Sequence, residues 1–230
     1  MVITDLLQQI PLFESLCDSE RERLATLLQR RSLHKGEILF HKGDAGSALF
    51  IIIKGLIKIG VSNKLGDEVT FAFLRSGDFF GEMALLDQHP RSADATALED
   101  SLLYVLNRDD FFPFLIKNEN TVRSILSALL RALSMRLRRT DDLLTEISFL
   151  TVPARLARRL IELAESLTTT GRDSNVYQIQ ISQRELAGML GVSRESISKE
   201  LKILRSKGLV TTARNTILIH NLDRLKRRSH

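Results

Sequence analysis

Residues 77–93 read GDFFGEMALLDQHPRSA and contain the parts of a small phosphate pocket. Gly81 allows the backbone to turn tightly and to approach a ligand, and Glu82 offers a carboxylate that can accept a hydrogen bond from a sugar hydroxyl. Residues 84–86 can form one helical turn whose first N–H groups are free. This half of the stretch therefore predicts a site for a sugar joined to an anionic group.

The second half of the stretch supplies the positive charge. Arg91 stands between the rigid Pro90 and the hydroxyl of Ser92. A planar guanidinium can donate a forked pair of hydrogen bonds to the two free oxygens of a phosphodiester. Each piece also occurs in ordinary surface loops, so the residues alone leave a plain loop open as the alternative.

Charge is distributed unevenly along the 230 residues, whose net charge is +5. Residues 1–150 hold 18 Lys and Arg against 21 Asp and Glu, and residues 151–230 hold 15 against 7. The C-terminal part alone is strongly basic, which favours a polyanionic partner such as DNA, RNA or an acidic membrane surface.

Short strands are predicted to follow an N-terminal helical segment. Residues 4–30 are expected to be helical, with a break at Pro11 and a capping box made by Ser19 and Glu22. After Leu33, short apolar runs alternate with glycine turns, which is typical of a sandwich or jelly roll. The expected strands are residues 37–40, 48–53, 56–61, 68–74, 93–98 and 102–106.

A long helical pattern runs from about Asp109 to Ile147. Its seam repeats in steps of three and four, as in a coiled coil. The members of this seam are Leu126, Leu129, Leu133, Arg136, Thr140, Leu143 and Ile147. The two polar members either fix the register of a dimer or serve a ligand.

A helix-turn-helix is predicted after a hinge at residues 149–152. Ser182 and Glu185 form a capping box, Gly191 makes the turn, and Ser193 caps a second helix that extends to about Lys207. The exposed side of that helix carries Arg194 and Glu195 near its start, where a recognition helix meets base edges. A helical hairpin without a DNA partner is the open alternative, with Glu195 merely paired to Lys199.

Both regions resemble the cyclic-AMP receptor protein (CRP/FNR) family. The run FGEMAL followed by PRSA is similar to its phosphate-binding cassette, and residues 39–44 and 49–55 are similar to its roll. The resemblance implies an α+β chain with a cyclic-nucleotide-binding jelly roll, a long central dimerisation helix and a winged helix-turn-helix. The implied domains are residues 1–108 for the roll with its N-terminal helices, 109–148 for the helix, 149–152 for the hinge and 153–230 for DNA binding.

The resemblance also assigns roles to residues. Cyclic nucleotide is expected at Gly81, Glu82, Met83, Ala84, Arg91, Ser92, Arg136, Thr140 and Asp141. DNA is expected at Ser182, Gln183, Ser193, Arg194, Glu195, Ser196, Ser198, Lys199 and Lys202. Dimer contacts are expected at Leu126, Leu129, Leu133, Leu143 and Ile147.

One of these positions departs from the family pattern. Asp141 stands where cyclic-AMP members often have Ser or Asn, and an ionised Asp can accept from an adenine amino group but cannot donate to a ring nitrogen. Lys199 stands where the family has Arg or Lys, and as a lysine it lacks the bidentate fork toward guanine. Base preference at both sites is therefore open.

Other classes of protein find less support. Cys17 is the only cysteine, which excludes an internal disulfide and an iron–sulfur cluster held by one chain. His34, His41 and His89 do not form an evident haem site, and we find no metal cluster and no catalytic motif of an enzyme. We expect a cytoplasmic protein with no membrane segment, because no apolar run is long enough to span a bilayer.

We therefore expect a homodimeric transcription regulator that answers to a cyclic nucleotide, with cyclic AMP as the allosteric ligand and no further cofactor. Its expected partners are double-stranded DNA with palindromic TGTGA-like half-sites and RNA polymerase. A regulator that binds DNA without cyclic AMP, or that answers another effector, is the first alternative. A nucleotide-binding regulatory subunit that acts on a protein partner is the second.

Overall fold

The computed structural model describes residues 3–63, 68–166 and 176–228, and its contacts divide the chain into two compact units. The first unit comprises residues 1–61 and 71–138, and the second comprises residues 62–70 and 139–230. The helices are α1 (Ile3–Gln9), α2 (Asp18–Leu27), α3 (Glu82–Asp87), α4 (Arg108–Leu115), α5 (Glu119–Phe149), α6 (Val152–Ser166), α7 (Gln183–Leu190), α8 (Arg194–Ser206) and α9 (Leu222–Lys226). The strands are β1 (Gln29–Leu33), β2 (Ile38–Phe40), β3 (Ala48–Lys54), β4 (Leu56–Ser62), β5 (Glu68–Arg75), β6 (Phe79–Phe80), β7 (Asp94–Ala97), β8 (Ser101–Asn107), β9 (Tyr177–Gln180), β10 (Val210–Ala213) and β11 (Thr216–Ile219).

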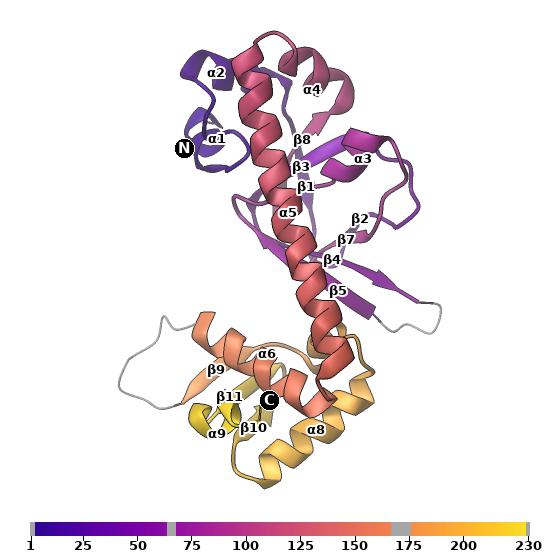
Figure 1. Cartoon of the computed structure of the whole chain (residues 1–230), viewed down its shortest axis with the longest axis vertical. Coiled ribbons are helices and arrows are strands. Elements are labelled where there is room, and N and C mark those ends of the chain that lie inside the picture. Colours follow the sequence, from indigo (N-terminus) through magenta and orange to yellow (C-terminus); the bar gives the residue numbers. More distant parts are fainter. Residues whose placement is uncertain (1–2, 64–67, 167–175, 229–230) are drawn as a thin grey trace. The chain divides into compact units, whose positions relative to one another are not determined.

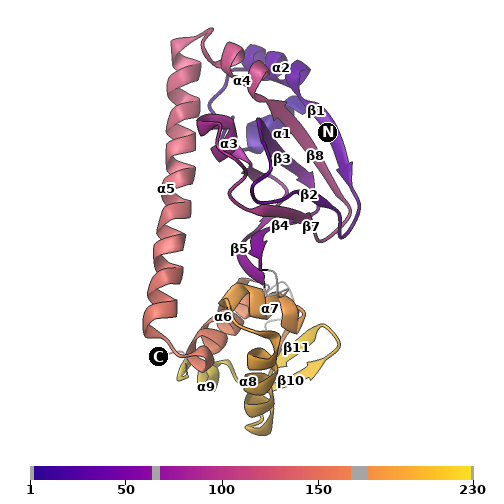
Figure 2. The same cartoon turned by 90° about the vertical axis from the view of Figure 1, so that its right-hand side faces the viewer.

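Two four-stranded sheets form the roll of the first unit. One sheet has the order β1-β8-β3-β6 and the other has the order β2-β7-β4-β5. Figure 2 shows β1, β8 and β3 of the first sheet and all four strands of the second. The register of the antiparallel pair β3 and β8 brings Ala48 opposite Asn107, so the strand that begins beside the 46–47 loop lies against the strand that leads into α4. The α+β fold with a roll, a long helix and a C-terminal helix-turn-helix confirms the prediction.

The roll has two apolar cores. In one, Phe40, Phe50 and Phe80 stack with ring centroids 5.2 to 6.1 Å apart. In the other, α1, α2 and α4 pack with the N-terminal half of α5 against β3 and β8 (Figure 1). The second core includes Leu85 of α3, which is 1% exposed, and this places the predicted cassette on the same core as α4 and α5.

Three expectations about local structure were wrong. Strand β1 begins at Gln29, inside the segment expected to be helical; its residues Gln29 to Ser32 are exposed along an edge of the sheet, so they show no apolar alternation. Helix α2 begins at Asp18, and the capping contact runs from the Cys17 N–H to the Glu20 carboxylate at 2.9 Å rather than between Ser19 and Glu22.

The third correction concerns the long helical pattern. It comprises two helices, because α4 ends at Leu115 and α5 begins only at Glu119. Phe111, Phe114 and Leu115 of α4 are buried in the roll's core, so this part of the pattern reflects packing within one chain rather than a coiled coil.

The second unit holds the helix-turn-helix and a small sheet. Helices α7 and α8 pack with α6, and β9, β10 and β11 form a three-stranded sheet in the order β10-β11-β9. Glu146, near the end of α5, lies 3.3 Å from Arg158 of α6. No helix in the described residues is both long and apolar enough to cross a bilayer.

Candidate functional site

The turn that opens the cassette requires glycine. Gly81 has a φ of +82°, and a Cβ there would lie 2.7 Å from Arg91 Nη1 and 2.9 Å from the Ala48 carbonyl oxygen. The chain can therefore bring Glu82 next to the Arg91 side chain only if residue 81 has no side chain. We refer to residues 81–92 as the cassette.

Glu82 is buried with a partner on one oxygen only. Its residue is 2% exposed, and its Oε1 accepts a hydrogen bond from Arg136 Nη1 of α5. Arg136 also donates from Nη2 to the Phe79 carbonyl oxygen at 2.6 Å. Glu82 Oε2 is buried and has no hydrogen-bond partner among the described residues. A buried carboxylate oxygen of this kind is costly unless a donor reaches it.

Arg91 is also buried, and its guanidinium is held by carbonyl groups and aromatic rings. Nη1 donates to the carbonyl oxygens of Ala48 at 3.0 Å and Gly81 at 2.9 Å. The guanidinium lies 4.4 Å from the ring centroid of Phe40. Its Nε is buried without an acceptor in the described chain.

Electrostatics at Arg91 follow from this burial. Burial lowers the pKa of the Arg91 guanidinium, and the carboxylates of Glu82 and Asp44 act in the opposite direction. An arginine stays protonated through such a change, so the pocket keeps its positive charge at neutral pH. An anionic ligand that reached Nε would restore part of the solvation that burial removes.

Gly46 packs closely against the Arg91 side chain. A Cβ at residue 46 would lie 2.2 Å from Arg91 Nε. From the sequence, Gly46 is one of the glycines expected in turns between strands. Its close approach to Arg91 becomes visible only in the folded structure. Its special role had no local signal, because the contact joins residues far apart in the chain.

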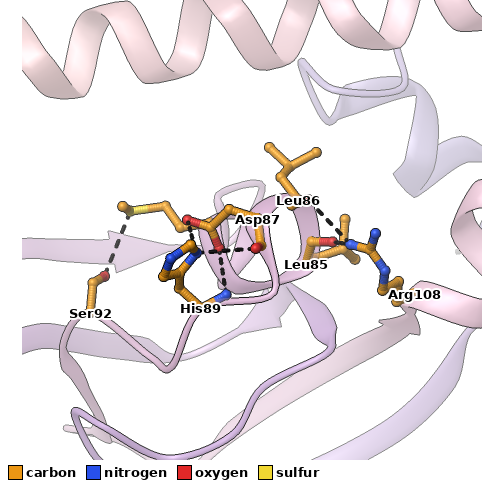
Figure 3. Close-up of polar contacts among 7 residues, drawn as sticks. Leu85, Leu86, Asp87, His89, Ser92 and Arg108 are labelled. Atoms are coloured by element: carbon orange, nitrogen blue, oxygen red, sulfur yellow. Dashed lines mark hydrogen bonds and ion pairs between the residues drawn. The ribbon is translucent and has the colours of Figure 1, made fainter.

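The other expected members of the cassette are placed differently. Ser92 is exposed and its hydroxyl donates to the Met83 sulfur at 3.6 Å (Figure 3). Met83 is 47% exposed, whereas Ala84 is 3% exposed and its side chain contributes to the core. A role for Ala84 in ligand binding would therefore be through its backbone.

The expected ligand residues on α5 fall into both units. Arg136 belongs to the first unit and contacts Glu82, as the resemblance implied. Thr140 and Asp141 are exposed residues of the second unit. Their roles toward the nucleotide remain predictions.

One residue of the predicted dimer seam is buried within its own chain. Leu129 is 3% exposed and lies in the core of its own roll, whereas the dimer contacts as a set remain a prediction. The exposed apolar residues of α5 instead include Leu126, Leu130, Leu137, Leu144 and Ile147. Leu129 and Arg136 lie on the side of α5 that faces the roll. A spacing of three and four residues predicts which residues share a side of a helix, but it does not tell whether that side faces the roll or a partner.

The helix-turn-helix is capped as expected. The Ser182 hydroxyl accepts from the Glu185 N–H at 3.1 Å, and the Glu185 carboxylate accepts from the Ser182 N–H at 2.7 Å. Gly191 has a φ of +63° in the turn, and the Ser193 hydroxyl accepts from the Ser196 N–H at 3.2 Å. Ser182, Gln183, Ser193 and Ser196 are half-buried at these helix starts.

The solvent-exposed face of α8 carries charged side chains. Its exposed members are Arg194, Glu195, Ser198, Lys199 and Lys202. Within the described chain none of these five side chains makes a hydrogen bond or an ion pair, and this excludes the local pairing of Glu195 with Lys199 as the reason for the glutamate.

A cleft of about 320 Å³ lies beside the start of α8. Arg184, Arg194, Arg214 and Asn215 line it together with Ser182 and Gln183. Arg214 and Asn215 form the turn between β10 and β11 and were not among the predicted DNA contacts. A basic cleft formed from a wing turn and two helix starts suits a polyanion's phosphates.

Comparison with known proteins agrees with both regions. Residues 30–118 match the model of the cyclic nucleotide-binding domain, and residues 154–228 match the model of the Crp-like helix-turn-helix domain. The chain is 30% identical over 225 residues to a CRP-like cAMP-activated global transcriptional regulator of Mycobacterium tuberculosis, covering 98% of this chain and 99% of that one. It is 36% identical over 207 residues to the cyclic AMP receptor protein of Thermus thermophilus, covering 90% of this chain and 91% of that one.

Solved structures show the same architecture. The c-di-GMP responsive global regulator CLP of Xanthomonas campestris matches with a TM-score of 0.81 and 25% identity, over 89% of this chain and 100% of that one. With two matching domains in this order and relatives of 30% identity or more along nearly the whole length, the chain belongs to the CRP/FNR family of DNA-binding, cyclic-nucleotide-responsive transcription regulators.

Proposed function

We propose that this chain is a homodimeric transcription regulator whose affinity for DNA is set by cyclic AMP. The observation that carries the proposal is that two buried atoms of the cassette, Glu82 Oε2 and Arg91 Nε, have no hydrogen-bond partner in the described part of the chain. The first needs a hydrogen-bond donor and the second needs an acceptor. A ribose hydroxyl beside a cyclic phosphodiester supplies both groups in one small molecule.

In this proposal the cassette holds the sugar and phosphate. Glu82 accepts from the ribose hydroxyl, Arg91 and Ser92 donate to the phosphate, and the backbone of Gly81, Met83 and Ala84 lies against it. Arg136 shares Glu82 with the ligand, because its Nη1 already bonds the other carboxylate oxygen. Thr140 and Asp141 are proposed to meet the base, with Asp141 able only to accept.

A different effector is the second candidate. One structural relative is described as c-di-GMP responsive, and Asp141 departs from the residues usual in cyclic-AMP members. A ligand with two phosphodiesters needs a second cationic partner besides Arg91. Competition between cyclic AMP and c-di-GMP for the purified protein distinguishes the two effectors directly.

We propose that the dimer forms through the exposed row of α5. We keep Leu126, Ile147 and the half-buried Leu133 from the sequence prediction, and we replace Leu129, Arg136 and Leu143 by the exposed Leu130, Leu137 and Leu144. These residues are separated by three, four or seven positions, so they lie on one side of the helix and give an apolar stripe. Dimerisation would match a two-fold palindromic operator.

We propose that α8 reads double-stranded DNA with TGTGA-like half-sites. Arg194 can fork onto a guanine and Glu195 can accept from a cytosine amino group, whereas Lys199 acts as a point charge. Ser182, Gln183, Ser193, Ser196, Ser198 and Lys202 are proposed as contacts that position the helix on phosphates. In the same proposal the protein acts in the cytoplasm, has RNA polymerase as a further partner and catalyses no reaction. The proposed domains are residues 1–108, 109–148, 149–152 and 153–230.

Arg194→Ala tests the assignment of the DNA site. We expect binding to the TGTGA duplex to weaken by about 1–3 kcal/mol and binding to duplexes with one altered base pair to change less, so that specificity relaxes at one position. Lys202→Ala is the control, since loss of a phosphate contact weakens binding to all sequences equally. Uniform weakening by Arg194→Ala would instead make Arg194 a phosphate contact.

A further inference from the structure

We propose that Arg108 is a positioning residue that fixes the cassette to the helices through which nucleotide binding is transmitted. The inference rests on the proposed function, because it concerns how the filled pocket communicates with the rest of the chain. Arg108 was not among the residues that the sequence singled out.

The side chain of Arg108 holds the C-terminal end of the cassette helix. Its Nη1 donates to the carbonyl oxygens of Leu85 and, at 3.3 Å, of Leu86 (Figure 3). Both carbonyls belong to the last turn of α3, where no intrahelical donor reaches them. A cation is favoured at this end of a helix, because its unpaired carbonyls carry partial negative charge.

The backbone of Arg108 holds the segment that leads into β3. Its N–H donates to the Ser47 carbonyl oxygen at 2.7 Å. Ser47 lies between Gly46, which contacts the Arg91 guanidinium, and Ala48, whose carbonyl accepts from it. One residue therefore touches both segments between which Arg91 is held.

The guanidinium of Arg108 is itself fixed in place. It lies 4.4 Å from the ring centroid of Phe112, one turn further along α4. Helix α4 buries Phe111 and Phe114 in the core that also contains Leu85 of α3 and Leu129 of α5. A displacement of α3 would thus be passed through Arg108 and this core to α4 and to the first half of α5.

This arrangement assigns a specific task to the side chain. Without its donors, α3 would still be held by Leu85, but the carbonyl end of the helix would have no charged partner and could shift independently of α4. Nucleotide binding would then order the cassette without moving α4. Loss of the Arg108 side chain should therefore reduce the effect of the ligand on DNA affinity more than it reduces the affinity for the ligand itself.

The test compares Arg108→Gln, Arg108→Lys and Arg23→Ala in the full chain. Arg23 is the matched control, since its guanidinium lies 5.4 Å from the ring centroid of Phe114 on the same helix and donates to no carbonyl of the cassette. For each variant, the dissociation constant of the TGTGA duplex is measured without and with saturating cyclic AMP. Because both values come from the same preparation, a loss of folded protein cancels in their ratio.

We expect the ratio to fall about tenfold in Arg108→Gln, to recover partly in Arg108→Lys and to stay unchanged in Arg23→Ala. A ratio within twofold of the unmodified chain in Arg108→Gln would overturn the inference, as would Arg108→Lys behaving no better than Arg108→Gln. If the unmodified chain bound no cyclic AMP, the proposed function would fail first. Intact coupling in the unmodified chain with no effect of Arg108 would leave that function standing and remove only this inference.

Discussion

Arg91 has a structural role in the roll in addition to its predicted role in binding phosphate. Its side chain was expected to bind phosphate, and the structure also gives it two carbonyl partners and a ring face inside the roll. Truncation to alanine would therefore leave the Ala48 and Gly81 carbonyls with one donor fewer and a void beside Phe40, so loss of response in that variant would not identify the phosphate contact alone.

Arg91→Lys separates these roles. A lysine keeps the charge but cannot fork onto two phosphate oxygens or present a planar face to Phe40. We expect cyclic AMP to bind at least about tenfold more weakly, since a hydrogen bond to a charged group contributes about 1.5–3 kcal/mol. Isothermal calorimetry measures the affinity and a thermal melt serves as the folding control; unchanged affinity would remove Arg91 from the ligand site.

Gly46→Ala changes the position of the Arg91 side chain without changing Arg91 itself. The added methyl would occupy the position of the Arg91 guanidinium and displace it from the pocket. We expect nucleotide affinity to fall by about tenfold, together with some loss of stability, because the displaced guanidinium no longer donates to the Ala48 and Gly81 carbonyls. Ser47→Ala is the control, as the Ser47 side chain is exposed. Equal affinities in the two variants would contradict the placement of Arg91.

At the scale of elements, α5 shows what a periodic pattern can and cannot predict. The sequence correctly predicted a long helix with polar positions at Arg136 and Thr140, because spacing fixes which residues share a side. It could not tell the row that faces the roll from the row that faces away, since Leu129 and Leu130 are the same residue type. Only the fold, which buries Leu129 against the roll, distinguishes them.

The same limit explains the other differences. The longer strands rich in apolar residues were predicted, but the two-residue strand β6 was not. The exposed edge strand β1 was also missed, because its partner β8 supplies the pairing and most of its own side chains face solvent. Within the cassette, Gly81, Glu82 and Arg91 were identified by type and order. Gly46 and Arg108 were missed, since each acts through contacts with distant segments.

Adjacent leucines of α5 provide a matched pair of mutations. Leu130 is 64% exposed, so Leu130→Asp should leave the monomer folded and place a charge in the proposed dimer stripe. Leu129→Ala should destabilise the roll by about 2–5 kcal/mol, as expected for a leucine truncated in a core. Sedimentation velocity reports the oligomeric state and chemical denaturation reports stability. A fully dimeric Leu130→Asp protein would contradict the proposed stripe.

At the scale of the whole molecule, the two units differ in the chemistry of their sites. In the first unit, the Glu82 carboxylate and the Arg91 guanidinium are buried, and each has one atom without a hydrogen-bond partner among the described residues. The second offers an exposed basic helix face and a basic cleft. The proposed ligand would bind the first unit and is expected to meet α5, so it could favour one arrangement of the proposed dimer, with a coupling typically of about 1–3 kcal/mol.

The effect of cyclic AMP on DNA affinity is the most direct test of the proposed function. Purified protein is titrated with a labelled palindromic TGTGA duplex at fixed salt, without nucleotide and with saturating cyclic AMP or cyclic GMP, because salt alone changes DNA affinity strongly. The account predicts that cyclic AMP tightens sequence-specific binding by about 5- to 150-fold and that cyclic GMP does not. Specific binding of the same strength in all three conditions would contradict a cyclic-AMP switch, although the DNA-binding regulator itself would remain.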